Sequence, residues 1–308
     1  MKQLYLHVIE NLQSHKYKMV FKKISILLLV LFLGVLPNSF VFAQESDVNP
    51  NLEATQSAQD SELEVFTRDR ETQKIVQLRT LYRDQVEVYR NSEKAYSIAK
   101  TNFEQVETLA ALEEAVKATK LVMMERSRVL ITYLELLDSV LIETNGIELD
   151  FKNQSHTELT GLINALKIHR DNINLSTNRE AMVVLADEFE PINFSYTTSV
   201  YKTLSLIRIG KIQEVRDKSE IIKTDIEKRN NAEDVSSVLV SKRKRAYTEI
   251  ERNFATVNEN LVKLNNQFLE AKVDGFTRSF YERILRDLGP IYAQISKSLD
   301  HLEELVTL

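Results

Sequence analysis

The chain has no cysteine and very few of the residues that interrupt helices. Without cysteine there can be no disulfide, no thiol nucleophile and no cysteine-based metal site. Proline occurs four times and glycine six times in 308 residues, and no proline lies between residues 51 and 190. A β-rich protein of this length needs many turn residues, whereas long helices with few connections do not. The composition therefore predicts an all-α fold.

The N-terminal segment has the features of a secretory signal peptide. Lys22 and Lys23 precede a thirteen-residue apolar run, Ile24–Leu36, and small residues follow at Val41 and Ala43. A basic region, an apolar region and a small-residue cleavage site make up the export signature. A membrane-spanning helix needs about 20 apolar residues, which is more than this run supplies.

We therefore expect residues 1–43 to be a signal peptide cleaved after Ala43, which places the mature protein outside the cytoplasm, secreted or in the periplasm or cell envelope. The alternative is an uncleaved membrane anchor over residues 24–43. Residues 1–18 are long for the basic region of a signal peptide, and a start at Met19 is a second interpretation of this end. Residues 44–60 are polar and acidic without periodicity, which predicts a disordered tether.

The charge of the mature chain argues against nucleic-acid binding. Removing residues 1–43 leaves 35 of the 40 basic residues and 44 of the 45 acidic residues, a net charge of −9. A nucleic-acid binder is expected to carry a basic face. The one dense basic run in the mature chain is 242–245, Lys-Arg-Lys-Arg. Four consecutive residues of a helix point in four directions, so a solvated helix turn is favoured over a patch for anionic lipids.

Hydrophobic periodicity predicts a helical bundle domain over residues 61–308, an elongated bundle of five to seven helices with two long antiparallel, coiled-coil-like hairpins, 61–144 and 191–273. The first helix is expected from about Ser61 to Val106. Its seam is Ile75, Tyr82, Tyr89, Tyr96 and Phe103, with Leu78, Ala99 and Val106 as companions. The second helix, to about Thr144, is apolar on nearly all sides from Val129 to Ile142, which predicts burial among several neighbours.

Local signals suggest where the remaining helices begin and end. Ser155–Glu158 and Thr177–Glu180 have the pattern of capping boxes that open helices. Pro191 is expected in the first turn of a long helix that reaches about Arg229. The next helix, 234–273, carries the most regular seam, and the last helix, 276–306, is expected to break or kink at Gly289-Pro290. The seam of 234–273 is Val240, Tyr247, Ile250, Phe254, Val257, Leu261, Leu264 and Phe268.

No catalytic, metal-binding or cofactor-binding motif is recognisable. No histidine pair has the spacing of a zinc-binding helix, and no glycine-rich phosphate loop or nucleophile elbow occurs. The aromatic row Tyr82, Tyr89, Tyr96 and Phe103 could stack on glycans or bases, but a packing seam is favoured. Glu135 and Asp138 are the best remaining candidates for a site, because a carboxylate in an apolar segment needs a partner or a shifted pKa. A salt bridge or an exposed edge is the favoured interpretation of both.

Three classes of function follow from these observations. The leading hypothesis is an exported, non-enzymatic scaffold or interaction module that binds a partner protein, or itself, through helical seams. The alternative is a membrane-anchored or membrane-active helical ectodomain, in which residues 24–43 hold the membrane. An enzyme would need a convergent polar constellation, and the sequence offers none, so no cofactor is expected.

Overall fold

The protein is all-α. The computed structural model describes residues 52–231 and 236–307, with side chains from residue 72 onward. The signal peptide predicted for 1–43, with its cleavage site, lies outside these residues. Within them the helices are α3 (Leu52–Val106), α4 (Leu109–Glu143), α5 (Leu149–Leu175), α6 (Arg179–Asn231), α7 (Ser237–Glu270) and α8 (Arg278–Thr307), with a short 3₁₀ turn at Val273–Gly275. The described residues contain no strand, and the prediction of five to seven helices is confirmed.

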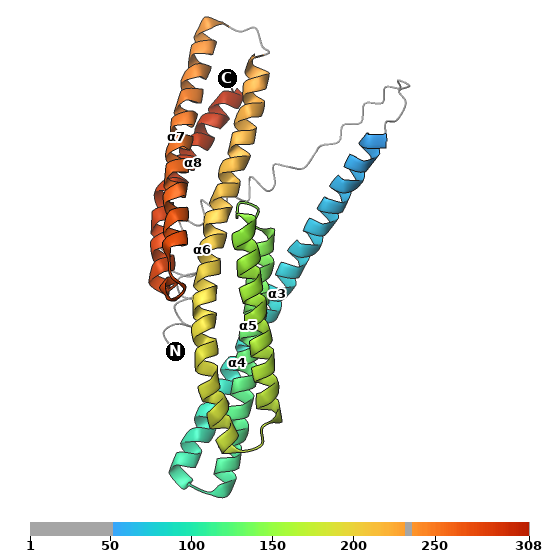
Figure 1. The fold of residues 1–308 in the computed structure, drawn as a ribbon, viewed down its shortest axis with the longest axis vertical. Coiled ribbons are helices and arrows are strands. Elements are labelled where there is room, and N and C mark those ends of the chain that lie inside the picture. Colours follow the sequence, from blue (N-terminus) through green and yellow to red (C-terminus); the bar gives the residue numbers. More distant parts are fainter. Residues whose placement is uncertain (1–51, 232–235, 308) are drawn as a thin grey trace. The chain divides into compact units, whose positions relative to one another are not determined.

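Helix α6 organises the compact unit formed by residues 59–308. It has 53 residues and is therefore about 80 Å long. Its N-terminal half packs against α4 and α5, and its C-terminal half packs against α8 and, less closely, α7 (Figure 1). The closest pairs are α4 with α5 and α7 with α8. The two hairpins expected from the sequence correspond to α3 with α4 and to α6 with α7. In the first, α4 packs most closely on α5, and in the second, α7 packs most closely on α8.

The core extends along α6 as one large cluster with a smaller cluster toward each end. The large cluster draws residues from α4 through α8. The apolar segment of α4 lies in it, with Leu134 and Leu141 fully buried. The predicted burial of Val129–Ile142 is confirmed for most of the segment, while Ile142 is 42% exposed. The smaller clusters join α6, α7 and α8 around Ile250, and α4, α5 and α6 around Ile173.

The seams predicted for α3 and α7 are confirmed over most of their length. Ile75 and Ala99 are buried, and the aromatic residues between them are half-buried. On α7 the seam residues from Ile250 to Phe268 are all buried. Both seams are shorter than predicted, because Val106 at the end of α3 and Val240 near the start of α7 are each more than half exposed. These two residues lie beside interhelical connections, where no neighbouring helix covers them.

Several helix boundaries differ from the sequence-based expectation. α3 begins at Leu52, so part of the expected tether 44–60 is helical. α5 begins at Leu149, and Ser155 is buried inside it, so the capping-box interpretation of Ser155 is wrong. The first turn of α5 is instead held by packing, since Phe151 contacts Phe268 of α7 with ring centroids 5.9 Å apart. The second capping signal is real but shifted by one residue: the Asn178 side chain accepts a hydrogen bond from the Ala181 N–H at 2.9 Å.

Two prolines lie inside helices that the sequence predicted to start or break there. Pro191 lies within α6 and Pro290 within α8, and both helices continue through them. A proline in a helix interior costs about 3 kcal/mol, because a hydrogen bond is lost and the ring clashes with the preceding turn. Both prolines are exposed, while Phe189 beside the first and Leu288 and Ile291 beside the second are buried. The anchored turns on either side hold each helix together.

Gly146 follows the end of α4, where a glycine commonly caps a helix, but it has a different role here. No described glycine has a positive φ, so the end of α4 is not a left-handed cap. Gly146 instead lies against the middle of α6, where a Cβ atom would come within 2.0 Å of the Gly210 carbonyl oxygen. A Cβ on Gly210 would meet the Ile147 side chain at 2.3 Å. Two glycines distant in the sequence thus let the α4–α5 connection approach the α6 backbone.

Candidate functional site

The outer flank of α3 carries a row of exposed apolar residues. α3 meets α4 through side chains such as Tyr82 and Tyr133, whose ring centroids are 5.5 Å apart. Next to this seam, at seven-residue intervals, lie Leu81, Val88 and Ala95, and all three are exposed. We call these three residues the α3 strip. A row with a seven-residue repeat faces one direction along a helix, which is the geometry that a second helix can pack against.

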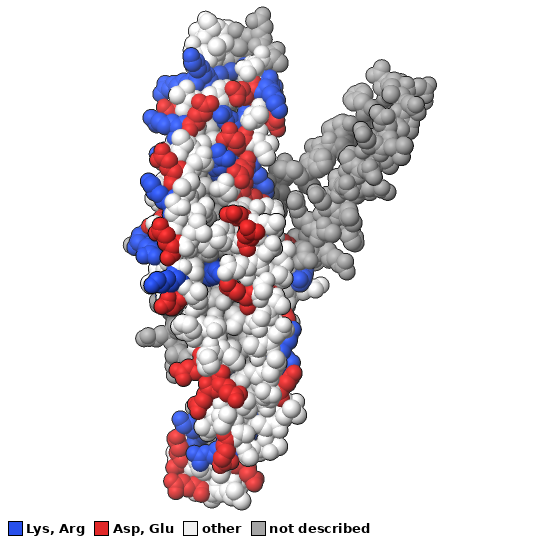
Figure 2. All heavy atoms as spheres, in the orientation of Figure 1, with Lys and Arg blue, Asp and Glu red and all other residues white. Residues whose placement is uncertain are grey.

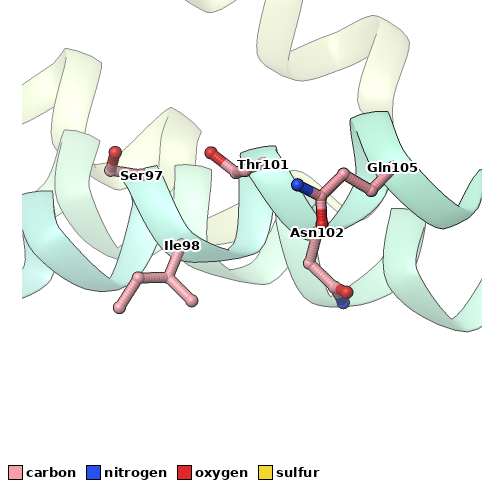
Figure 3. Close-up of a pocket in the computed structure, with 5 residues that line it drawn as sticks. All are labelled: Ser97, Ile98, Thr101, Asn102 and Gln105. Carbon is pink, nitrogen blue, oxygen red and sulfur yellow. The ribbon is translucent and has the colours of Figure 1, made fainter.

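A shallow hollow continues the α3 strip toward the end of the helix. Figure 3 shows its five lining residues, all of which come from one face of α3: Ser97, Ile98, Thr101, Asn102 and Gln105. Ile98 is 71% exposed, and the other four are polar and uncharged. None of the five lining residues is titratable, so the lining itself supplies no base to activate the hydroxyls of Ser97 and Thr101.

The basic run 242–245 does not form one patch. Arg243 is buried and donates a hydrogen bond to the Asn230 carbonyl oxygen at 3.2 Å, while the other three residues are exposed. In the view of Figure 2, basic and acidic residues alternate over the upper part of the molecule, and no broad area of one sign is visible. The prediction that the run diverges around the helix is confirmed, and its central arginine ties α7 to the end of α6.

Glu135 and Asp138 each pair with a basic residue of α5. The Asp138 carboxylate lies 2.7 Å from Nδ1 of His156, and Glu135 lies 3.4 Å from the Lys167 ammonium group. Glu135 is about one-third exposed. The salt-bridge interpretation is confirmed for Glu135, whereas Asp138 is hydrogen-bonded to the His156 ring. Each contact joins α4 to α5 beside the large core cluster.

His169 lies in a buried aromatic and cationic contact that the sequence did not reveal. It is 3% exposed, and its ring packs against Phe189 of α6 at 5.6 Å. The guanidinium of Arg126 stacks over the same Phe189 ring at 3.6 Å. Burial lowers the pKa of His169, and the nearby Arg126 lowers it further, against an opposing effect of Glu188. The imidazole is therefore held neutral where α4, α5 and α6 meet.

A group of tyrosines surrounds Arg208 near the middle of α6. Tyr133 of α4 contacts Tyr196 at 6.4 Å, and Tyr201 contacts Tyr281 of α8 at 6.1 Å. Burial raises the pKa of Tyr133, and neighbouring phenols raise it further. These residues come from helices distant in the sequence, so no linear motif marks them. In the sequence, the available signal was a single cation, Arg208, inside the mostly apolar segment 204–210.

Two kinds of site are missing from the described part of the chain. No group of three or more His, Asp and Glu residues there is close enough to hold a metal ion. None of the described helices combines the length and the apolar character needed to cross a membrane.

No protein-family model, no curated protein and no solved structure matches this chain.

Proposed function

We propose that this protein is an exported, non-enzymatic interaction module of the cell envelope that binds through its helical surfaces. The observation that carries the proposal is the α3 strip, in which Leu81, Val88 and Ala95 repeat every seven residues and remain exposed beside an occupied seam. Apolar residues at such flanking positions are typical of helices that contact two neighbours. The partner is a helix of another protein or of a second copy of this chain.

Two further features support binding over catalysis. The carboxylates with the best claim to chemistry, Glu135 and Asp138, are already paired with α5. The hollow on α3 is lined by uncharged residues of a single helix, whereas catalysis needs reactive groups that converge in a preorganised pocket. The export part of the proposal comes from the basic and apolar pattern of residues 22–43.

Export is tested by fractionating cells that produce the chain and by mass spectrometry of its N-terminus. We expect a mature chain that begins at Gln44 in the exported fraction. Intact chain in the cytoplasm would contradict export. Uncleaved chain in the membrane fraction would favour the alternative, in which residues 24–43 anchor a helical ectodomain.

Binding is tested by placing a photo-crosslinking amino acid at Val88 and, as a matched control, at Glu87 of the same helical turn. We expect a crosslinked product from position 88 and little from position 87. A product of twice the chain mass identifies self-association, and another mass identifies a second protein. Equal yields at the two positions would exclude the α3 strip as the binding surface. So would a crosslinked product that persists in a Leu81→Asp/Ala95→Asp variant that remains folded by circular dichroism.

A further inference from the structure

The first turns of α6 have one exposed face that is both apolar and acidic. Residues spaced three, four and seven apart lie on the same side of a helix, and a group of exposed residues near the start of α6 has this spacing. We call this group the α6 entry face: Glu180, Val183, Val184, Asp187, Glu190, Pro191 and Phe194. Val183, Val184 and Phe194 are 53%, 55% and 58% exposed, respectively. Large apolar side chains are thus grouped in water on one face of the helix.

The acids of the α6 entry face have no ion-pair partner in the described part of the chain. No basic side chain there lies within ion-pairing distance of Glu180, Asp187 or Glu190, and Arg179, which begins the helix, forms no ion pair with its neighbour Glu180. The basic residues in the second half of α5, the helix that packs against this part of α6, have partners of their own. These pairs are Lys167 with Glu135 at 3.4 Å and Arg170 with Asp171 at 3.1 Å.

The C-terminal half of the same helix shows the ordinary arrangement. There, acids pair with bases three or four residues away on α6 itself. These pairs are Glu214 with Lys218 at 2.7 Å, Glu220 with Arg216 at 3.6 Å and Asp225 with Lys228 at 3.8 Å. The positions three and four residues from Glu180, Asp187 and Glu190 hold no basic residue. The helix that carries the entry face therefore does not neutralise its charge.

The helix dipole does not account for these acids either. Its effect falls off within the first turn, and α6 begins at Arg179, so Asp187 and Glu190 lie beyond its reach. Pro191 adds an unmet hydrogen bond to the same face. Because proline has no N–H, the Asp187 carbonyl oxygen, four residues earlier, lacks its usual helical donor. The donor for this oxygen has to come from outside the regular helix.

We propose that the α6 entry face docks a cationic amphipathic helix of another protein. Its Lys and Arg side chains neutralise Asp187 and Glu190 and donate to the Asp187 carbonyl oxygen, while its apolar side chains cover Val184 and Phe194. A second copy of this chain does not meet these requirements. A two-fold symmetric contact through this face brings the same acids together, and like charges in an interface repel one another.

The α6 entry face is a different surface from the α3 strip, and the inference holds whether or not the α3 strip binds. A variant that disrupts the strip, Leu81→Asp/Ala95→Asp, should leave docking on α6 unchanged. Failure of this inference and failure of the proposed function are therefore distinguishable.

The test uses a fluorescein-labelled peptide of leucine and lysine, about 18 residues long and patterned as an amphipathic helix. Its binding to the purified protein is followed by fluorescence anisotropy, with a leucine–glutamate peptide of the same pattern as the control. Asp187→Asn/Glu190→Gln should weaken binding of the lysine peptide about tenfold, because two charge-assisted contacts are lost. Asp225→Asn/Glu227→Gln makes the same change of charge at exposed positions in the other half of α6 and should leave binding nearly unchanged.

A second pair of variants tests the apolar part of the face and separates docking from general attraction to an acidic protein. Phe194→Ser should weaken binding about tenfold, because its exposed ring is covered on docking, whereas Ile221→Ser, at a position that is 62% exposed, should not. Both residues lie at the surface, and circular dichroism checks that each variant folds.

Three outcomes would overturn the proposal. The first is equal binding of the leucine–glutamate peptide. The second is an equal effect of the variants in the two halves of α6, which would indicate attraction to the net charge alone. The third is a change of oligomeric state in Phe194→Ser, measured by analytical ultracentrifugation, which would assign the α6 entry face to a second copy of this chain.

Discussion

Helices α3 and α8 both carry a seam along one face, yet they bury it to very different extents. On α8, Ile284, Leu288 and Ile291 have no exposed surface. On α3, the aromatic residues of the seam are only half-buried. The branched aliphatic side chains of α8 fit between α6 and α7, whereas the long tyrosine side chains of α3 reach across to α4 and keep an edge in water. The same type of periodicity therefore produces a tight contact in one place and a looser one in another.

The largest expected effect in this comparison comes from a charge placed in the α8 seam. Leu288→Asp puts a carboxylate where no solvent reaches, which should cost on the order of several kcal/mol of unfolding free energy. Leu285→Asp is the matched control, because Leu285 lies on the same helix and is 40% exposed. Urea unfolding of both variants measures the difference. Similar midpoints for the two would mean that the α8 seam is misplaced.

A single added methyl group should separate a close backbone approach from open space. Gly146→Ala brings a Cβ into the Gly210 carbonyl and should cost about 1–3 kcal/mol, the usual effect of overpacking. Gly161→Ala on α5 meets no atom within 4 Å and should stabilise the helix by about 0.5–1 kcal/mol, because alanine favours a helix interior over glycine. Equilibrium unfolding compares the two substitutions. A destabilised Gly161→Ala or an unaffected Gly146→Ala would contradict the packing of the α4–α5 connection.

The looser contact of α3 is expected to contribute less per pair. Tyr82 and Tyr133 form a tilted ring pair at 5.5 Å, and such pairs contribute about 0.5–1.5 kcal/mol beyond their buried area. A double-mutant cycle with Tyr82→Ala and Tyr133→Ala should return a coupling energy in that range. A coupling energy near zero would show that α3 and α4 are not in register at this point.

The smallest expected effect concerns pH and the junction of α4, α5 and α6. The pKa of His169 is lowered in the folded state by burial and by Arg126, so the unfolded chain takes up a proton first as the pH falls. Stability should therefore be fully present above about pH 6.5, the ordinary histidine value, and decrease below it. His169→Gln should remove this part of the pH dependence, as measured by chemical unfolding between neutral and mildly acidic pH. An unchanged pH dependence in His169→Gln would mean that other groups cause it.

Sequence reasoning recovered the seam of α3 even where its residues looked unsuitable. Gln85 and Ser92 occupy companion positions in the seven-residue repeat, and they are half-buried and buried, respectively. The buried Val86 lies one residue away from a predicted position and was missed. The seven-residue period of apolar residues locates the centre of a seam but not its width. The width depends on how closely the neighbouring helix approaches.

The candidate sites were less predictable from the sequence. Glu135 and Asp138 stood out because they interrupt an apolar run, and the structure gives each of them a basic partner from α5. The surroundings of Arg208 combine tyrosines of α4 and α8. No spacing along the chain encodes such a group, since its members meet only when helices distant in the sequence pack together.

The sequence by itself determined the helical class, a range of five to seven helices, the approximate extent of most of them and the faces that they bury. These properties depend on local backbone preference and on the period of apolar residues, and short stretches of the chain are enough to specify both. Only the tertiary structure decided that α6 continues through Pro191, that Gly146 lies against Gly210 and that Arg208 is surrounded by phenols. Each of these depends on contacts between distant residues, whose packing energy outweighs or redirects the local preference.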